Sequence, residues 1–303
     1  MTRKSVVQVS PKLKEVLDQV VAGGDQAARV TADPVSVVRE QRSAEDAELA
    51  GLLASCLALG NAGVARDRCR AALSRVGSPL TLHLEAPWDE VATRLGNWKH
   101  RFYTGEDVAK LLVGARRVQR RWGGLGKRFG ALLDEVGTLQ GAAARWVEEI
   151  QKEGWGKGGP GRMARHLLPI PGEGGSASKR LMLYLRWMVR PDDGVDLGLW
   201  TRWMSPAMLV IPVDVHIARL ARNMGLTKRA TVDWKTAQEI TGRLAEFRPG
   251  DPVAYDFALC HLGMVQGCPS RRDEARCKGC GVQPVCLHWT ATSSQVPKRL
   301  KER

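Results

Sequence analysis

Four cysteines near the C-terminal end have a type and spacing suited to binding a metal. They form the pattern Cys268-x8-Cys277-x2-Cys280-x5-Cys286, which has one close pair and a single cysteine on each side. A structural zinc site usually has two close pairs set well apart. A compact loop that gives one thiolate to each iron of a cube fits this spacing better. We therefore predict a 4Fe–4S cluster, with zinc and then disulfides as the alternatives.

A carboxylate upstream of these cysteines stands at the expected start of a helix. Asp214 lies in Ile211-Pro-Val-Asp-Val-His216-Ile-Ala-Arg219-Leu. As an N-cap, its carboxylate would accept hydrogen bonds from the first N–H groups of the helix. Beneath a sugar, it would stabilise the positive charge that develops as an N-glycosidic bond breaks. The spacing alone favours the cap. His216 and Arg219 would contact a phosphate or brace the turn.

A glycine-rich turn precedes another strong helix, expected over residues 177–189. The turn reads Leu168-Pro-Ile-Pro-Gly-Glu-Gly-Gly-Ser176. Such a turn presents unpaired backbone N–H groups at a helix N-terminus, which is a favourable place for a phosphate. Glu173 is an unfavourable neighbour for that phosphate. We expect phosphate contacts from Gly172, Gly174, Gly175 and Ser176.

Together these segments resemble the helix-hairpin-helix DNA glycosylases, in the branch of endonuclease III and adenine glycosylase. The iron–sulfur loop of that branch has gaps of six, two and five residues, so the first gap here is two residues longer. The stretch from Ser178 to Asp193 also resembles a bacterial family known as a domain of unknown function. The similarity covers roughly residues 35–290.

The resemblance implies a role for several residues. Asp214 would be the catalytic carboxylate, and the turn would hold the DNA backbone near the lesion. Bifunctional members have a lysine just after the turn that forms a Schiff base; here Ser176 takes that place and Lys179 follows three residues later. This implies a monofunctional enzyme that uses water, with lyase activity through Lys179 as the alternative. The glutamine that fills the gap left by an extruded base in endonuclease III is missing near Cys56, and Asn61 is the nearest polar residue.

The charge balance favours a polyanionic partner. The 303 residues carry 46 Lys and Arg against 32 Asp and Glu, a net charge of +14. Double-stranded DNA is the first candidate, and a solvated basic surface is the alternative. The sequence has no run of ~18 apolar residues and no signal-type N-terminus, so we expect a cytoplasmic, nucleoid-associated monomer. Cys56, Cys69 and Cys260, which lie among apolar neighbours, are expected in the core.

A basic helix face offers a second place for DNA. Arg116, Arg117, Arg120 and Arg121 share one face of a helix that begins after a capping pair, Thr104 and Asp107. This face, followed by Trp122, Lys127 and Arg128, would run along phosphates or be solvated.

The hydrophobic spacing predicts an all-α fold. Further helices are expected near residues 11–21, 45–57, 64–76, 131–152 and 233–247, and from Asp251 onwards. The only candidate strand, 208–213, contains Pro212, which argues against it.

The resemblance implies two lobes, with DNA across the cleft between them. One is a helical bundle, residues 35–204; the other, which holds the cluster, combines residues 1–34 and 205–290, and residues 291–303 form a basic tail. The predicted function is a DNA glycosylase that acts on damaged or mismatched bases. The alternatives are a non-catalytic protein that binds particular DNA structures or damage, and a zinc-containing nucleic-acid adaptor.

Overall fold

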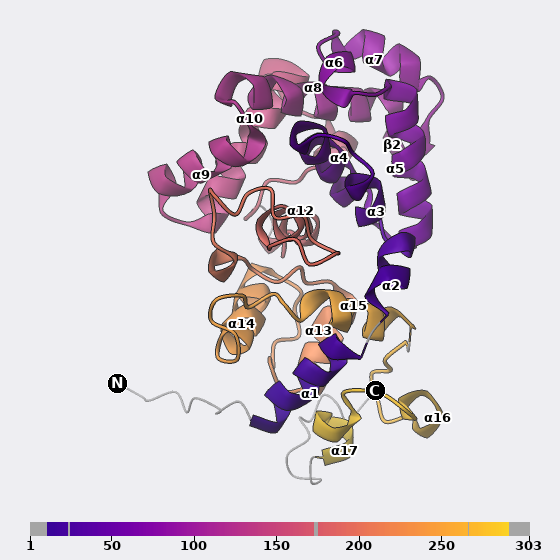
Figure 1. Ribbon diagram of the computed structural model, residues 1–303, viewed down its shortest axis with the longest axis vertical. Coiled ribbons are helices and arrows are strands. Elements are labelled where there is room, and N and C mark those ends of the chain that lie inside the picture. The colour runs from indigo at the N-terminus through magenta and orange to yellow at the C-terminus, as the bar shows by residue number, and fades with distance from the viewer. Residues whose placement is uncertain (1–10, 24, 173–174, 266, 291–303) are drawn as a thin grey trace. The chain divides into compact units, whose positions relative to one another are not determined.

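A computed structural model describes residues 11–23, 25–172, 175–265 and 267–290, and these residues are mostly helical, as predicted (Figure 1). The chain divides into two compact units. The central unit is Gln26–Leu209, and the terminal unit combines Met1–Asp25 with Val210–Arg303. The sequence had placed these boundaries at 34/35 and 204/205. The basic tail, 291–303, lies outside the described residues. No helix in the described part of the chain is long and apolar enough to cross a membrane.

The central unit consists of helices and one two-stranded hairpin. Its elements are α2 (Gln26–Ala32), α3 (Val35–Arg39), α4 (Ala44–Leu57), α5 (Ala62–Val76), α6 (Leu80–His83), α7 (Trp88–Leu95), β1 (Lys99–His100), β2 (Tyr103–Thr104), α8 (Gly105–Trp122), α9 (Leu125–Val136), α10 (Leu139–Trp155), η1 (Gly156–Gly158), α11 (Arg162–Arg165), α12 (Lys179–Val189) and η3 (Pro206–Met208).

Helix α4 is the centre of this unit, because α3, α5, α8 and α12 all pack against it. It is therefore buried on nearly every side, where the sequence predicted one apolar stripe. Its buried Glu48 accepts hydrogen bonds from the side chains of Gln119 (2.8 Å) and Trp200 (2.6 Å). The backbone N–H groups of Leu125 and Gly126 donate to the same carboxylate, each at 3.0 Å. Four donors thus offset the cost of burying this charge.

Two predicted helices are wrong in their extent. The single helix expected over 131–152 is two helices, α9 and α10. Gly137 ends α9 in a left-handed conformation (φ +72°), and the Thr138 side chain then caps α10 by accepting from the Gly141 N–H. The helix expected from Asp251 begins only at Asp256, after a series of turns. The first error arises because the apolar spacing continues across Gly137, and the second because Asp251-Pro252 was interpreted as an N-cap followed by the first helical residue.

Local capping signals were read correctly. Thr104 and Asp107 form a capping box at the start of α8. Helix α8 then packs closely on α10, where Gly114 and Gly154 leave room for backbone. A Cβ at Gly114 would lie 2.5 Å from the Ile150 carbonyl oxygen. The residues 208–213 form no strand, and β1 and β2 are the only strands in the described residues.

The terminal unit joins both ends of the chain. Its elements are α1 (Pro11–Ala22), α13 (Val215–Asn223), α14 (Trp234–Ala245), α15 (Asp256–Val265), α16 (Glu274–Cys277), η4 (Gln283–Val285) and α17 (Leu287–Thr290).

Helix α1 is held by Asp18. This carboxylate accepts hydrogen bonds from Arg248 (2.6 Å) and from the Tyr255 hydroxyl (3.0 Å). The hydrogen bond from Lys14, and then those from Arg248 and Tyr255, lower the pKa of Asp18 to about 2. The N-terminal helix is therefore part of the terminal unit.

Candidate metal centre and nucleic-acid interface

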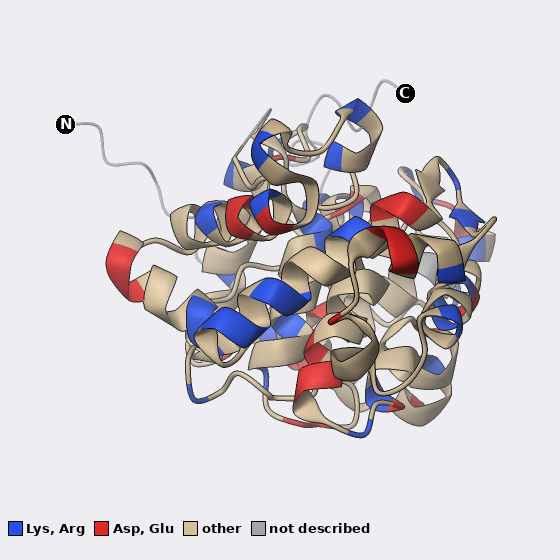
Figure 2. Cartoon of the chain, turned by 90° about the horizontal axis from the view of Figure 1, so that it is seen from above, with Lys and Arg blue, Asp and Glu red and all other residues tan. Residues whose placement is uncertain are grey.

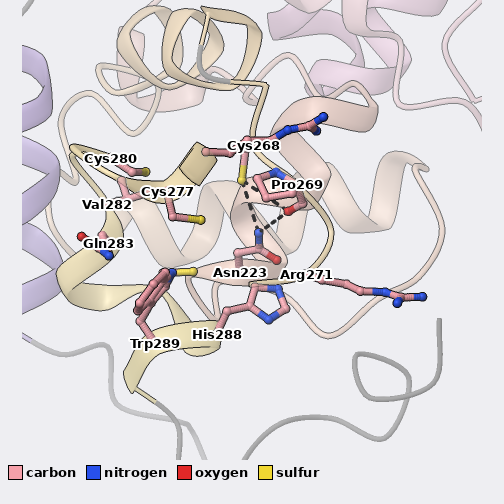
Figure 3. Close-up of a pocket in the computed structure, with 12 residues that line it drawn as sticks. Asn223, Cys268, Pro269, Arg271, Cys277, Cys280, Val282, Gln283, His288 and Trp289 are labelled. Carbon is pink, nitrogen blue, oxygen red and sulfur yellow. Dashed lines mark hydrogen bonds between the residues drawn. The ribbon is translucent and has the colours of Figure 1, made fainter. Parts of the chain in front are cut away.

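The four predicted cysteine ligands line one cavity in the terminal unit (Figure 3). The side chains of Cys268, Cys277 and Cys280 turn toward the same space in the figure. Cys286 follows η4 and lines the same cavity. Asn223, Arg271, His288 and Trp289 are among the other lining residues.

The donor set of this cavity fits a thiolate-bound metal. All four side chains are free thiols, and none of the described residues that line the cavity is a carboxylate. Burial, and to a smaller extent the neighbouring thiols, raises the pKa of Cys268 and of Cys280, and raises that of Cys286 to about 11. A cation here would stabilise the thiolates that burial disfavours. In the described residues, however, no three His, Cys, Asp or Glu side chains already stand in a metal-binding arrangement.

Asp214 is the N-cap of α13, which is the structural role that its spacing suggested. Its carboxylate oxygen Oδ1 accepts from the N–H groups of His216 and Ile217, both at 2.9 Å. The side chain is half-buried. These bonds hold the carboxylate in one orientation at the start of the helix. They neither require nor prevent a catalytic role.

His216 and Arg219 contact one another on the same helix. A guanidinium N–H of Arg219 lies 2.9 Å from Nδ1 of His216. The Arg219 Nε is buried and has no hydrogen-bond partner among the described residues. The two residues therefore brace the first turns of α13, one of the two roles that the sequence left open.

The last residue of α13 reaches the cysteine loop. The Asn223 side chain is 2% exposed, and its amide nitrogen lies 3.4 Å from the Cys268 sulfur and 3.4 Å from the Pro269 carbonyl oxygen. Sequence analysis missed Asn223. The available signal was its place seven residues after His216, on the same side of the helix.

In the central unit, the glycine turn needs its glycines for backbone conformation. Gly172 (φ +97°) and Gly175 (φ +73°) are left-handed. A Cβ at Gly175 would meet no atom within 4 Å, whereas one at Gly172 would lie 2.7 Å from the Gln140 amide nitrogen. Gly174, a predicted phosphate contact, and Glu173, the residue expected to disfavour that phosphate, lie outside the described residues.

The helix after this turn, α12, begins without a side-chain cap. Ser178 occupies the cap position with a left-handed backbone (φ +50°) and makes no cap hydrogen bond. Its hydroxyl is buried and has no partner among the described residues. The Ser178 N–H donates instead to the hydroxyl of exposed Ser176 (3.1 Å). The Ser178 side chain therefore does not cap α12, and the N-terminus of a helix is a favourable place for an anion. Lys179 is half-buried as the first residue of the helix.

Arg180 joins this helix to three other segments of the central unit. Its guanidinium donates to the Cys56 carbonyl at the end of α4 (2.7 Å) and to the Leu167 carbonyl before the turn (3.1 Å). It also donates to the His166 carbonyl and to the Tyr103 hydroxyl, the latter at 3.2 Å. The turn, the end of α4 and the hairpin are therefore held together. Sequence analysis gave Arg180 no role.

The hairpin between β1 and β2 exposes an aromatic side chain. Its two-residue loop consists of Arg101, which is left-handed (φ +55°), and Phe102, which is 43% exposed. The Arg101 guanidinium lies against Gly60, where a Cβ would come within 2.3 Å of its Nη2. The buried Tyr103 ring supports Phe102 edge-on, with ring centroids 4.6 Å apart. Because Arg101 is not a glycine, its left-handed backbone conformation is strained, and such strain is common at functional sites.

Three other predicted positions have structural roles. Asn61, proposed as a polar substitute, caps α5 by accepting from the Val64 N–H (3.0 Å). Cys56 and Cys69 lie in the core as predicted, whereas Cys260 is only half-buried.

Much of the basic face of α8, for which the sequence left phosphate binding and a solvated surface as alternatives, is paired with carboxylates. Arg116 and Arg120 both pair with Glu85, and Arg121 pairs with Glu153. Lys and Arg lie beside Asp and Glu on several helices (Figure 2).

Arg128 is also not available to DNA. It is buried, pairs with Glu149 at 2.6 Å, and stacks over the Trp122 ring at 3.9 Å.

Comparison with known proteins assigns the chain to a family. A family model described as "Protein of unknown function (DUF2400)" matches residues 33–265, well over half of the chain. The chain belongs to this family. The matched region contains Asp214 and the glycine turn, and it ends before Cys268. No curated protein and no solved structure gives a significant match.

Proposed function

We propose that this DUF2400 protein is a DNA N-glycosylase of the helix-hairpin-helix type that removes a damaged or mismatched base from double-stranded DNA. The observation that carries the proposal is the arrangement around Arg180. This side chain holds the glycine turn, the uncapped start of α12 and the exposed hairpin in one fixed arrangement within the central unit. An anion site beside an exposed aromatic is what an enzyme needs to hold a DNA strand and unstack a base.

In this proposal the central unit binds the distorted duplex. Backbone N–H groups at the start of α12 and the hydroxyl of Ser176 bind a phosphate. Phe102 inserts between bases, and Arg101 stays at the backbone beside it. Side chains that intercalate in this way unstack neighbouring bases and offset the unstacking with new contacts. The Tyr103 ring and the hydrogen bonds of Arg180 keep the hairpin from bending away.

The terminal unit supplies the chemistry. As the base departs, the Asp214 carboxylate stabilises the positive charge on the sugar and accepts the proton of the attacking water. Its N-cap bonds hold it in one position, so little reorganisation is needed in the transition state. With Ser176 in the place of the Schiff-base lysine, the product is an intact abasic site. Lyase activity through Lys179 is the alternative outcome.

The four cysteines would hold a 4Fe–4S cluster, with zinc as the alternative. Bound there, such a cluster supplies a structural cross-link between the residues of the loop. The donor set of four thiols supports this. In the proposed function the basic residues between Arg271 and Lys278 then lie on the loop that the cluster orders, where they contact the phosphate backbone.

The test is a panel of duplexes, each with a single damaged or mismatched base, assayed for abasic sites. Wild-type protein should release one class of base, and Asp214→Asn should not. Affinity should also fall steeply between low and physiological salt, because binding releases counterions. Binding that does not change with salt, or excision that survives in Asp214→Asn, would refute the proposal.

A non-catalytic DNA-binding protein on the same scaffold is the second candidate. It is favoured by one observation: Asp214 already has a structural role as the N-cap of α13. For this candidate, wild-type protein binds damaged or distorted duplexes with salt-dependent affinity and releases no base from any of them.

A further inference from the structure

The cysteine ligands receive their hydrogen bonds from different sources. Within the loop, the backbone N–H groups of Cys280, Gln283 and Trp289 donate to the carbonyl oxygens of Cys277, Cys280 and Cys286. Cys268 is different, because its sulfur is bonded by a side chain from outside the loop, the amide of Asn223 on α13 (Figure 3).

The Asn223 amide nitrogen lies within hydrogen-bonding distance of two neighbouring positions of the loop. Its Nδ2 lies 3.4 Å from the Cys268 sulfur and 3.4 Å from the Pro269 carbonyl oxygen. The side chain is 2% exposed, so water does not compete for these bonds. An amide nitrogen has two N–H donors, which is enough for both positions.

We propose that Asn223 is a positioning residue for the cluster. It fixes the Cys268 ligand and raises the reduction potential of the bound 4Fe–4S group. An N–H···S bond withdraws charge from the sulfur and so stabilises the more negative, reduced state. The same bond joins the cluster loop to the helix that starts at Asp214. The inference rests on the proposed cluster, but it does not depend on glycosylase activity.

Two variants of the cluster-loaded protein distinguish the effect of the Asn223 hydrogen-bond donor from the effect of its side-chain shape. Asn223→Leu has a similar volume and no donor, and Asn223→Asp has the same shape with an added negative charge. The control is Asn97→Asp, the same chemical change at an exposed asparagine of the central unit. The measurements are the midpoint potential, from an anaerobic redox titration, and the rate of cluster loss to an iron chelator.

The expected result is a graded fall in potential. Asn223→Leu should shift the one-electron equilibrium toward the oxidised state by about tenfold, which corresponds to about 59 mV. Asn223→Asp should shift it further, and both variants should lose iron severalfold faster than wild type. Asn97→Asp should match wild type. If Asn223→Leu does not retain a cluster, Asn223→Asp, whose shape is native, carries the measurement.

One outcome would overturn only the role of Asn223, and another would overturn the cluster itself. A cluster present in wild type, with unchanged potential and unchanged iron loss in both Asn223 variants, overturns the role of Asn223 and leaves the cluster intact. Stoichiometric zinc and no iron in wild type purified without air removes the cluster itself, and the role of Asn223 with it.

Discussion

The two candidate regions differ in how their residues are held. In the central unit, the residues around the glycine turn are anchored by α12, which has eight buried residues, and by the hydrogen bonds of Arg180. In the terminal unit, Cys277 ends α16, and the other three cysteines lie in the loop segments around α16, η4 and α17. These elements have three or four residues each and no buried residue among those described. The first region is built into a core. The second has little apolar burial to hold it, so we expect a bound metal to supply its stability.

Removing the metal should therefore have the largest effect on stability, and this effect should be confined to the terminal unit. Cys280→Ser should abolish stoichiometric metal binding and expose the cysteine loop. Structural metal sites contribute on the order of 10 kcal/mol to the folding of small loops. Hydrogen exchange should rise over residues 268–290 and stay low in α4 and α12.

The control is Cys260→Ser, a half-buried cysteine of the same unit that does not line the cavity. Equal protection of the cysteine loop in Cys280→Ser and wild type would show that the loop is stable without metal, and the contrast between the units would disappear.

The next largest effect should follow from the carboxylate of the terminal unit. Asp214→Asn keeps an oxygen that can cap α13 but removes the charge that opposes the developing cation. Loss of one preorganised electrostatic group costs roughly 10²–10³ in rate, about 3–4 kcal/mol. Duplex affinity should be retained, because the loss is felt only in the transition state. The measurement is single-turnover excision together with equilibrium binding.

Asp233→Asn is the matched control for this variant. Asp233 is also an N-cap in the terminal unit, accepting from the Thr236 N–H at 2.8 Å. If both variants lose activity equally, the loss comes from weaker helix caps in the terminal unit and not from a catalytic charge on Asp214.

A smaller effect is expected at the hairpin of the central unit. Phe102→Ala should weaken duplex binding and base unstacking by about 1–3 kcal/mol, the usual value of one stacking contact with a base. A fluorescent base analogue beside the lesion reports the unstacking. Leu82→Ala, at an apolar residue that is more exposed, is the control. Equal losses in the two variants would mean that Phe102 has no specific contact with DNA.

The sequence predicted features that depend on neighbours along the chain. The capping box at Thr104 and the start of the helix near Asp233 are local features, and both were predicted correctly. The α9–α10 break was missed, because one glycine interrupts a pattern that is otherwise continuous.

Features made by distant residues could not be predicted in this way. Arg180 meets Cys56 across 124 positions, and Asn223 meets Cys268 across 45. Such contacts depend on how the helices pack. In the sequence alone, Arg180 and Asn223 are ordinary polar residues of a helix, so nothing indicates their partners.

The smallest predicted effect concerns the Asp18 carboxylate, which helps to fasten α1 to the terminal unit without any metal. Asp18 has its pKa lowered from 3.8 to about 2, mainly by Lys14, so its bonds stabilise the fold when it is ionised. A lowered folded-state pKa gives stability that is present above pH 3.8 and lost as the pH falls toward 2. Because Asp18 is largely solvated, the contribution should be under about 1 kcal/mol. Asp18→Asn should therefore lower the denaturant midpoint of the terminal unit slightly at pH 7, and the difference from wild type should vanish near pH 2. The measurement is urea unfolding of metal-free protein at a series of pH values, followed by the fluorescence of a label placed on α1. A difference that stays constant over this pH range would show that the charge of Asp18 does not fasten α1, and that the shape of its side chain does.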